Sequence, residues 1–489
     1  MNFSSLINQI AKRLPDKTAV IENGASITYS ELWDKIEAIA NSLCDIELKE
    51  GGKVALVLPN CKEFIYSFFA ILRANIIAIP LNPHLTASEL KKIFDNSKPD
   101  ALISDSATIC KILAKDESLL QDKIVISLDA ISLDNVNKIA KSFLTMDQLY
   151  QPKRHLSIQK LVTKNDQIAS INYTYRGYGY PLGAMLTHGN YIHGAVGYIR
   201  LVKPTLEQRF LLMMPISHIF TLIGCVVVPL LRGATVVILK TAIPRHIFNA
   251  IQHYKIDFLV SVPTLFQVLL KNYDSSKHDI TSLKYGISGG APIDAALYNE
   301  IRNKMKFEVL QGYGLTETMP IICNPKERVK PGALGVPGHE VKVKIINKSG
   351  SEVKVGEKGD ILIGGPTVMK GYYNHQRETR EALKNGWIHT GDIGRLDESG
   401  YLYFEGLDKG IVKVGGNTVD LLEVKNVLSS HPDVSDVRVY AKKNDLWGNI
   451  IEAEVCLRKN TNLSEREIQK FCSKNLAIYK VPRKISIEK

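Results

Sequence analysis

The sequence predicts an α/β protein built around parallel strands. Between residues 27 and 104, short apolar runs such as Val54–Leu58 and Ala101–Ser104 alternate with segments that have apolar residues at helical spacing, such as Glu63–Ala74. This alternation is typical of βαβ units. It resumes beyond residue 165, and strand-like runs dominate residues 331–404. We therefore expect a large body of two layered α/β subdomains and a β-rich subdomain, followed by a small α+β domain.

Several element boundaries can be predicted in chain order. Thr86-Ala-Ser-Glu89 and Ser464-Glu-Arg-Glu467 have the pattern of capping boxes, so a helix should begin at each. Residues 145–165 are polar and lysine-rich and should form a surface connection. Residues 423–429 predict a helix, and the alternating residues 450–457 predict a strand of the small C-terminal domain.

The composition limits the possible partners. The 489 residues are 45% hydrophobic, which suits a soluble globular protein with a large core, and the formal net charge is +12. A lysine-rich solvated surface explains this charge, as does a basic face for a nucleotide, coenzyme A, an acidic acyl carrier protein or anionic lipid. Basic residues do not interleave with aromatic ones and no zinc-ligand spacing occurs, so nucleic acid is not an expected partner.

The cysteine pattern and the apolar runs predict a cytoplasmic protein. Seven scattered cysteines, without a C-x-x-C pair, suit free thiols in a reducing compartment. Residues 1–17 are polar and amphipathic, so we expect no secretory signal. The most apolar run, Thr221–Leu231, has 11 residues, whereas a membrane-spanning helix needs roughly 20. We expect it to be core, with at most a peripheral membrane contact.

A glycine-rich stretch lies between Tyr173, where a strand should end, and Leu186, where a helix should begin. Gly177, Gly179 and Gly183 would allow backbone N–H groups to turn toward a bound anion. The glycines alone are equally consistent with an ordinary strand-to-helix turn.

The surrounding residues resemble a known family. Tyr173-Thr174, Gly179-x-Pro181-x-Gly183 and Thr187-His188 are similar to the phosphate loop Y-T-S-G-T-T-G-x-P-K-G of the adenylate-forming (AMP-binding) enzymes. The closest resemblance is to long-chain fatty acyl-CoA and acyl-carrier-protein synthetases. The resemblance implies a phosphate loop over residues 173–183. The side chains differ: the family's serine, threonine and lysine positions hold Tyr175, Gly177, Tyr178 and Leu182.

Other motifs match the family more closely. Gln311-Gly-Tyr-Gly-Leu-Thr-Glu317 agrees at every position, and the resemblance implies that Tyr313 packs on adenine, Thr316 binds the α-phosphate and Glu317 holds Mg²⁺. Residues 286–292 resemble the adenine shelf, and Trp387-Ile-His-Thr-Gly-Asp392 resembles the motif whose aspartate binds the ribose hydroxyls. The nucleotide-binding residues implied in this way are Thr174, Gly177, Gly179, Gly183, Gly289, Gly290, Ala291, Gln311, Gly312, Tyr313, Gly314, Thr316 and Asp392.

The C-terminal part resembles the family's mobile lid. Gly406–Lys413 is similar to the hinge G-R-x-K-D-x-I-K, but Leu407 replaces the arginine that contacts the ribose and Gly410 replaces the aspartate. The resemblance implies a body over residues 1–405 and a lid over 406–489. The residues implied on the thiol-transfer face of the lid are Lys409, Lys413 and Gly416. The sequence ends at Lys489, before the point at which the family's terminal lysine motif would follow.

The resemblance implies activation of a fatty acid or related hydrophobic carboxylate by ATP and Mg²⁺, with transfer to the thiol of coenzyme A or of carrier-protein phosphopantetheine. The catalytic residues would be Thr316, Glu317, His218 and Arg176. His218 lies in a segment similar to L-P-L-F-H-x-x-G. The loop lysine and the ribose arginine are replaced, and we expect the terminal lysine to be missing as well. Arg176 could replace one of these cations at the phosphates.

Two other interpretations remain open. The protein could be a non-catalytic homologue that binds acyl chains or acyl-carrier protein, with Tyr175, Arg176, Tyr178 and Tyr180 filling the phosphate site. It could also be a partial enzyme that passes a preformed acyl-adenylate to a thiol. We favour the ligase, because the adenine, Mg²⁺ and ribose motifs are intact.

Overall fold

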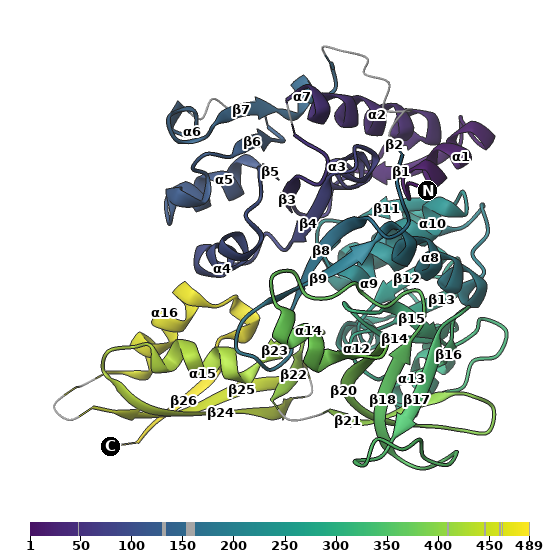
Figure 1. Cartoon of the computed structure of the whole chain (residues 1–489). Coiled ribbons are helices and arrows are strands. Elements are labelled where there is room, and N and C mark those ends of the chain that lie inside the picture. Colours follow the sequence, from purple (N-terminus) through teal and green to yellow (C-terminus); the bar gives the residue numbers. More distant parts are fainter. Residues whose placement is uncertain are drawn as a thin grey trace.

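The computed structural model describes residues 1–46, 48–129, 134–152, 162–407, 410–444, 446–458, 461 and 463–488. Figure 1 shows a large body and a smaller C-terminal part beside it. Residues 153–161, in the predicted surface connection, and Lys409 lie outside the described residues.

The first sheet of the body confirms the predicted βαβ units. Its strand order is β7-β6-β5-β3-β4-β8-β9; β3 to β8 pair in parallel, and β9 is antiparallel to β8. The strands are β3 (Lys53–Val57), β4 (Ile77–Leu81), β5 (Ala101–Ser104), β6 (Ile124–Ser127), β7 (Ser142–Thr145), β8 (Ile168–Thr174) and β9 (Leu182–Thr187). The helices between and before them are α1 (Ser5–Arg13), α2 (Tyr29–Asp45), α3 (Lys62–Arg73), α4 (Ala87–Ser97), α5 (Ser106–Leu113), η1 (Glu117–Leu119), α6 (Asp134–Ile139) and α7 (Met146–Leu149).

The second sheet has the order β16-β15-β14-β13-β12-β10-β11-β1-β2, with a parallel centre and antiparallel edges. Its strands are β1 (Thr18–Glu22), β2 (Ala25–Thr28), β10 (Arg209–Leu212), β11 (Thr235–Ile238), β12 (Phe258–Ser261), β13 (Tyr285–Ser288), β14 (Glu308–Leu315), β15 (Met319–Cys323) and β16 (Val336–Pro337). The helices of this half are α8 (His188–Val202), α9 (Ile219–Thr221), α10 (Val228–Leu231), α11 (Pro244–Tyr254), α12 (Pro263–Asn272) and α13 (Ala295–Met305).

The most apolar run of the chain is buried, as predicted. It forms the π-helical segment η3 (Leu222–Val227) between α9 and α10. Every residue of η3 is buried, and all of them except Gly224 belong to the main hydrophobic core. Within the described residues, the structure contains no helix of the length and apolarity needed to cross a membrane.

The β-rich subdomain and the C-terminal domain complete the expected α/β architecture. The subdomain contains β17 (Lys342–Ile346), β18 (Gly359–Gly364), α14 (Gln376–Ala382), β19 (Leu383–Lys384), β20 (Trp387–Leu396) and β21 (Leu402–Leu407). The lid contains β22 (Ile411–Val414), β23 (Asn417–Asp420), α15 (Leu421–Ser429), β24 (Val434–Asn444), β25 (Gly448–Leu457), α16 (Glu465–Asn475), η4 (Ile478–Lys480) and β26 (Lys484–Glu488), and it has a hydrophobic core of its own.

Helix caps explain several boundaries. Both predicted capping boxes form: Thr86 and Glu89 begin α4, and Ser464 and Glu467 begin α16. The stretch between Tyr173 and Leu186 is not the strand-to-helix turn that we expected. Residues 182–187 add the strand β9, and α8 begins only at His188, capped by Thr187. The glycine-rich loop therefore connects two antiparallel strands.

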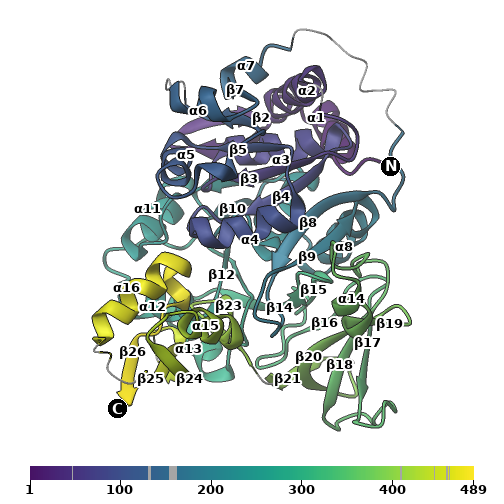
Figure 2. The ribbon, with the colours of Figure 1, turned by 60° about the vertical axis from the view of Figure 1, so that its left-hand side comes forward.

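The lid packs against the body in this structure. Helix α16 contacts α4, and Figures 1 and 2 both show these helices next to each other. Lys480 of the lid is fully buried, and its Nζ lies 2.7 Å from Oε1 of Glu89 in the body and 2.9 Å from Oε2 of Glu423 in the lid. Because a buried ammonium needs compensating charges, this triad fixes the contact between the two parts.

Candidate active site

The β8–β9 loop, residues 175–181, carries two of the three glycines that the sequence singles out. Gly177 and Gly179 have φ angles of 83° and 78°, a conformation that favours glycine. Gly183 instead lies in β9 opposite Tyr173, and a Cβ there would lie 2.6 Å from Cγ2 of Ile171. Its role in the structure is close strand packing. Thr174 ends β8 and pairs with Leu182.

The tyrosines of the loop have partners outside it. The Tyr178 hydroxyl donates to Glu381 (2.7 Å) and the Tyr180 hydroxyl donates to Glu378 (2.8 Å), both on α14. Tyr175 lies against the lid, where Nζ of Lys480 is 3.9 Å from its ring centroid. These contacts account for the three tyrosine side chains that a non-catalytic interpretation places in the phosphate site.

Arg176 is the residue of the loop that meets the other predicted site residues. Its guanidinium donates to the carbonyl oxygens of Thr390 (2.6 Å) and His389 (2.7 Å) on β20. Its Nε lies 3.5 Å from Oε1 of Glu317. Burial alone would lower the pKa of Arg176, but the neighbouring Glu317 and Tyr372 raise it by more than burial lowers it. The pKa is therefore higher than usual, and the side chain is a permanent cation.

Glu317 lies in the β14–β15 turn at the centre of the site. Its carboxylate is buried and accepts a hydrogen bond from the Tyr372 hydroxyl at 2.6 Å. Thr316 is half-buried in the same turn. Gly314 permits the turn, because a Cβ there would overlap the carbonyl oxygen of Met319. Tyr372 could not be predicted as a site residue, because the surrounding G-Y-Y-N stretch carries no signal.

Gln311 ties the predicted adenine shelf to the β14 motif. Its side chain donates to the carbonyl oxygens of Ala291 (3.2 Å) and Gly312 (2.8 Å) and accepts from the backbone N–H of Ile293 (2.9 Å). On the shelf, a Cβ at Gly289 would lie 2.6 Å from the Phe220 ring, so only glycine leaves this aromatic side chain in place.

Tyr313 and Asp392 form a hydrogen-bonded pair. The Tyr313 hydroxyl donates to Oδ2 of Asp392 at 2.6 Å. Asp392 is buried, and burial raises its pKa above the usual value despite this bond and the charges of Arg176 and Lys413. The pair therefore places a hydroxyl and a carboxylate side by side, and both groups can form hydrogen bonds with a polyhydroxylated ligand.

The lid contributes Lys413 and Gly416 to the same region. The Lys413 ammonium donates to Oγ1 of Thr418 (2.6 Å), and desolvation lowers its pKa despite the neighbouring Asp392 and Glu317. The carbonyl oxygen of Gly416 lies 3.3 Å from where a Cβ of Gly290 would stand. The lid hairpin thus lies against the predicted adenine shelf.

His218 faces this region from the body. The residue is partly open to solvent, and the protein packed around it together with the nearby Lys413 lowers its pKa below the ordinary value. Its Nδ1 accepts from the Phe220 N–H at 3.4 Å at the start of α9. The imidazole is therefore neutral near pH 7.

The site can accommodate a divalent cation that arrives with a ligand. The described residues contain no cluster of three or more His, Cys, Asp or Glu side chains that could hold a metal by itself. Glu317 offers one buried carboxylate, and one carboxylate together with substrate phosphates is a common arrangement for Mg²⁺. The donor set thus fits a phosphate-borne Mg²⁺.

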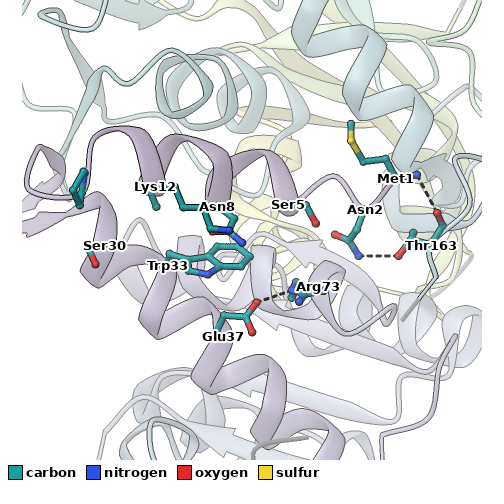
Figure 3. Close-up of a pocket in the computed structure, with 12 residues that line it drawn as sticks. Met1, Asn2, Ser5, Asn8, Lys12, Ser30, Trp33, Glu37, Arg73 and Thr163 are labelled. Atoms are coloured by element: carbon teal, nitrogen blue, oxygen red, sulfur yellow. Dashed lines mark hydrogen bonds and ion pairs between the residues drawn. The ribbon is translucent and has the colours of Figure 1, made fainter. Parts of the chain in front are cut away.

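A cavity elsewhere in the body is separate from these residues. It has a volume of about 810 Å³, and none of the predicted site residues lines it. Figure 3 shows Trp33 and the Glu37–Arg73 ion pair (2.7 Å) on its wall, next to α1. Its polar lining does not suit an apolar substrate.

Comparison with known proteins agrees with the arrangement of these residues. The sequence model of the AMP-binding enzyme family matches residues 7–373, and that of the AMP-binding enzyme C-terminal domain matches residues 423–488. An oxalate–CoA ligase from Arabidopsis thaliana is 30% identical over 99% of this chain and 94% of its own length. A feruloyl-CoA synthase from Amycolatopsis sp is 28% identical (97% and 92%), and a long-chain-fatty-acid–CoA ligase from Escherichia coli O157:H7 is 28% identical (98% and 90%).

Two solved structures of one Bacillus subtilis protein, o-succinylbenzoate CoA synthetase, are informative. A double mutant bound to its product analogue OSB-NCoA matches with a TM-score of 0.86, and the complex with AMP matches with 0.70. Both are 26% identical and cover 99% of this chain and 94% of theirs. Because identity and coverage are the same, the difference between the two TM-scores reflects a different arrangement of the chain in the two solved structures. The fold, the two family matches and the full-length relatives agree: the chain belongs to the AMP-binding enzyme family.

Proposed function

We propose that the protein is an adenylate-forming acid–CoA ligase that activates a hydrophobic carboxylic acid, most specifically a fatty acid. The observation that carries this proposal is the meeting of Arg176, Asp392 and Glu317 in one buried cluster beside Lys413 of the lid. Such a cluster can bind a ribose and a charged phosphate group at once. We assign residues 1–405 to the nucleotide-binding body and residues 406–489 to the lid.

The proposed substrate class rests on the segment that follows His218. Phe220 and the η3 helix are apolar and buried. Burial of a second carboxylate, as in oxalate, would require a cation, because an unpaired buried charge is very costly. The η3 segment Leu222–Val227 has no charged residue. A hydrophobic acid is therefore favoured over a dicarboxylate.

In the first step, a carboxylate oxygen of the acid attacks the α-phosphorus of ATP and pyrophosphate leaves with the bonding electrons. Arg176 would stabilise the phosphate charge, and Asp392 would accept hydrogen bonds from the ribose hydroxyls. Bound Mg²⁺, held by Glu317, would neutralise phosphate oxygens. Thr316, in the same turn, would donate a hydrogen bond to the α-phosphate.

In the second step, the coenzyme A thiol attacks the acyl carbonyl, gives up its proton, and AMP leaves. The lid of this chain packs with Gly416 against Gly290, and the higher TM-score to the product-analogue complex supports a thiol-transfer arrangement. Neutral His218 adds no positive charge beside Lys413, which eases burial of that ammonium.

An activity assay tests the proposal directly. The purified protein is mixed with Mg·ATP, coenzyme A and one acid at a time: medium- and long-chain fatty acids, ferulate or oxalate. We expect pyrophosphate release and an acyl-CoA detected by mass spectrometry with the fatty acids. A signal with ferulate alone would reassign the substrate to aromatic acids.

Two further arms decide between the remaining alternatives. Without coenzyme A, the acyl-adenylate itself should be detected, and its absence with every acid would favour the non-catalytic homologue or the partial enzyme. Replacing coenzyme A by a phosphopantetheinylated acyl carrier protein tests the second acceptor. Transfer to the carrier protein alone would overturn the assignment as a CoA ligase.

A further inference from the structure

The β8–β9 loop holds an anion that belongs to the protein itself. Oδ2 of Asp420, from the lid, accepts a hydrogen bond of 2.8 Å from the backbone N–H of Gly179. Its other oxygen, Oδ1, accepts from the N–H of Leu422 at 2.9 Å and caps helix α15. The Asp420 side chain is fully buried, so the contact excludes water.

The way in which this carboxylate is bound resembles the binding of a phosphate. Both hydrogen bonds come from backbone N–H groups, and within the described residues no lysine, arginine or histidine pairs with Asp420. Backbone N–H groups of glycine loops and of helix N-termini are the donors that proteins commonly offer to phosphate oxygens. Asp420 therefore uses a donor that a bound polyphosphate would need.

Packing leaves no room for both anions. Gly179 is buried beneath α15: a Cβ on it would lie 2.5 Å from Nδ2 of Asn426 and 3.1 Å from Cγ of Leu422. The lid touches the loop a second time through Lys480 and Tyr175. A phosphate at the Gly179 N–H can enter only when α15 moves away.

We propose that Asp420 is a positioning residue for the lid: its carboxylate occupies an anion position of the β8–β9 loop in the docked state and competes there with the polyphosphate of the nucleotide. The inference rests on the proposed function, since it takes this loop to be the phosphate site. The docked lid and a filled loop are then mutually exclusive.

The experiment measures lid position while an anion fills the loop. A fluorophore pair is placed on exposed Cys110 of α5 and on a Lys470→Cys residue of α16, and inorganic tripolyphosphate is titrated. We expect energy transfer to fall as tripolyphosphate binds. In Asp420→Asn, the half-maximal concentration should drop about tenfold, because a hydrogen bond to a charged acceptor is replaced by one to a neutral acceptor.

The substitution preserves the local fold and has a matched control. Asparagine is as good a helix cap as aspartate, so α15 should keep its N-terminus. Asp294 caps α13 in the same way, through the N–H of Leu297, and is not in contact with the β8–β9 loop. Asp294→Asn should leave the titration unchanged.

The outcomes separate this inference from the proposed function. The competition would be overturned if calorimetry showed that tripolyphosphate binds without changing energy transfer. It would also be overturned if Asp420→Asn gave the same titration as the unsubstituted protein, or if tripolyphosphate did not bind at all. Lid displacement in a protein that adenylates no acid would keep the inference and reject the ligase. Ligase activity in a protein whose lid does not move with tripolyphosphate would keep the ligase assignment and reject the competition.

Discussion

The side chain at position 182 explains why a cation in this site has to come from elsewhere. Leu182 is fully buried in the main hydrophobic core, where a lysine would lose its hydration. Arg176 enters from the loop and reaches Glu317. Because its fork-shaped guanidinium already binds two carbonyl oxygens of β20, it is held in place before any ligand arrives.

Replacing Arg176 should impair the first half-reaction. In Arg176→Ala we expect pyrophosphate release to slow by about 10²–10³, the usual effect of removing one preorganised electrostatic group. Arg176→Lys should recover part of the rate. Tyr178→Phe, in the same loop, removes only the bond to Glu381 and serves as control. Equal rates in Arg176→Ala and the control would contradict this role.

Asp392 should make nucleotide binding sensitive to mild acid. Its pKa is raised by burial, so the carboxylate takes up a proton at a higher pH than an ordinary aspartate. The ionised form is the better acceptor for ribose hydroxyls, so affinity should fall as the pH is lowered through this raised pKa. Calorimetry of Mg·ATP across pH 4–7 checks this. In Asp392→Asn the binding should be weaker and lack this pH dependence.

The sequence places its strongest site predictions in two contiguous motifs, and the structure brings these two motifs together. Residues 311–317 and 387–392 do meet, as Tyr313 and Asp392 show. The roles of Tyr372 and Asp420 could not be predicted from the sequence, because they depend on contacts between segments far apart in the chain. A tyrosine or a helix-capping aspartate looks the same in a sequence whether or not a carboxylate or a loop N–H faces it.

Helix α8 begins on a buried histidine. Nδ1 of His188 accepts a hydrogen bond from the Phe3 N–H at 3.1 Å, and burial lowers its pKa to about 4. Between this value and the ordinary value of 6.5, the unfolded chain binds more protons than the folded one. Stability is therefore lost as the pH falls through this window.

The acid sensitivity can be measured by urea unfolding at pH 7 and pH 4.5. We expect His188 to account for at most about 3 kcal/mol of the loss, because its pKa lies at about 4 in the folded protein and at the ordinary value of 6.5 in the unfolded chain. His188→Gln removes the titrating group and should lose less stability between the two pH values, although it is less stable at pH 7. An equal loss in both proteins would exclude His188 as the source.

The β22–β23 hairpin should be essential for the thiol step alone. A Cβ at Gly416, where φ is 82°, would lie 2.5 Å from Cγ1 of Val262, so Gly416→Ala should prevent the docked position. We expect acyl-CoA formation to fall while pyrophosphate release persists. Gly350→Ala has a similar φ of 84° but open space around it, and it should affect neither step. Equal loss of both steps would contradict this division.

Elements were predicted most reliably where caps mark them, and least reliably in the β8–β9 hairpin. The capping boxes of α4 and α16 appear as expected because both partners are local in sequence. Strand β9 was missed because Leu182–Thr187 is short and apolar and precedes a real helix. Only its pairing with β8 distinguishes it from the first turn of that helix.

Three buried charged side chains meet at the contact between the lid and the body. Glu89, Glu423 and Lys480 are each fully buried, and Lys480 belongs to the lid while Glu89 belongs to the body. Burial raises the pKa of Glu423 although the Lys480 ammonium opposes this shift. Such an arrangement is stable only while all its members are present.

Removing the ammonium should release the lid. Lys480→Met would leave two buried carboxylates without their cation, a cost of about 3–5 kcal/mol in the docked state. We expect the lid to undock, with a larger radius of gyration in small-angle X-ray scattering. Lys474→Met, an exposed position of the same lid, should scatter like the unsubstituted protein. An unchanged radius in Lys480→Met would show that other contacts hold the lid.

The architecture could be predicted at this scale, but the docking could not. Alternating strands and helices predict the layered α/β body. The helix and strand patterns after residue 420 predict a small α+β domain, which in the structure has a core of its own. The contact between Glu89 and Lys480 joins residues 391 positions apart, and their types are unremarkable in the sequence. The surfaces through which the lid and the body meet are determined by their shape and charge in the folded protein.

The carboxylate of Glu89 has one further consequence. Its Oε2 completes the capping box of α4 with Thr86, while its Oε1 binds Lys480 of the lid. The first turn of a body helix and the contact with the lid thus share one side chain. Hydrogen–deuterium exchange of the amides at the start of α4 should accelerate whenever the lid leaves, so an unlabelled helix of the body can report each opening of the lid.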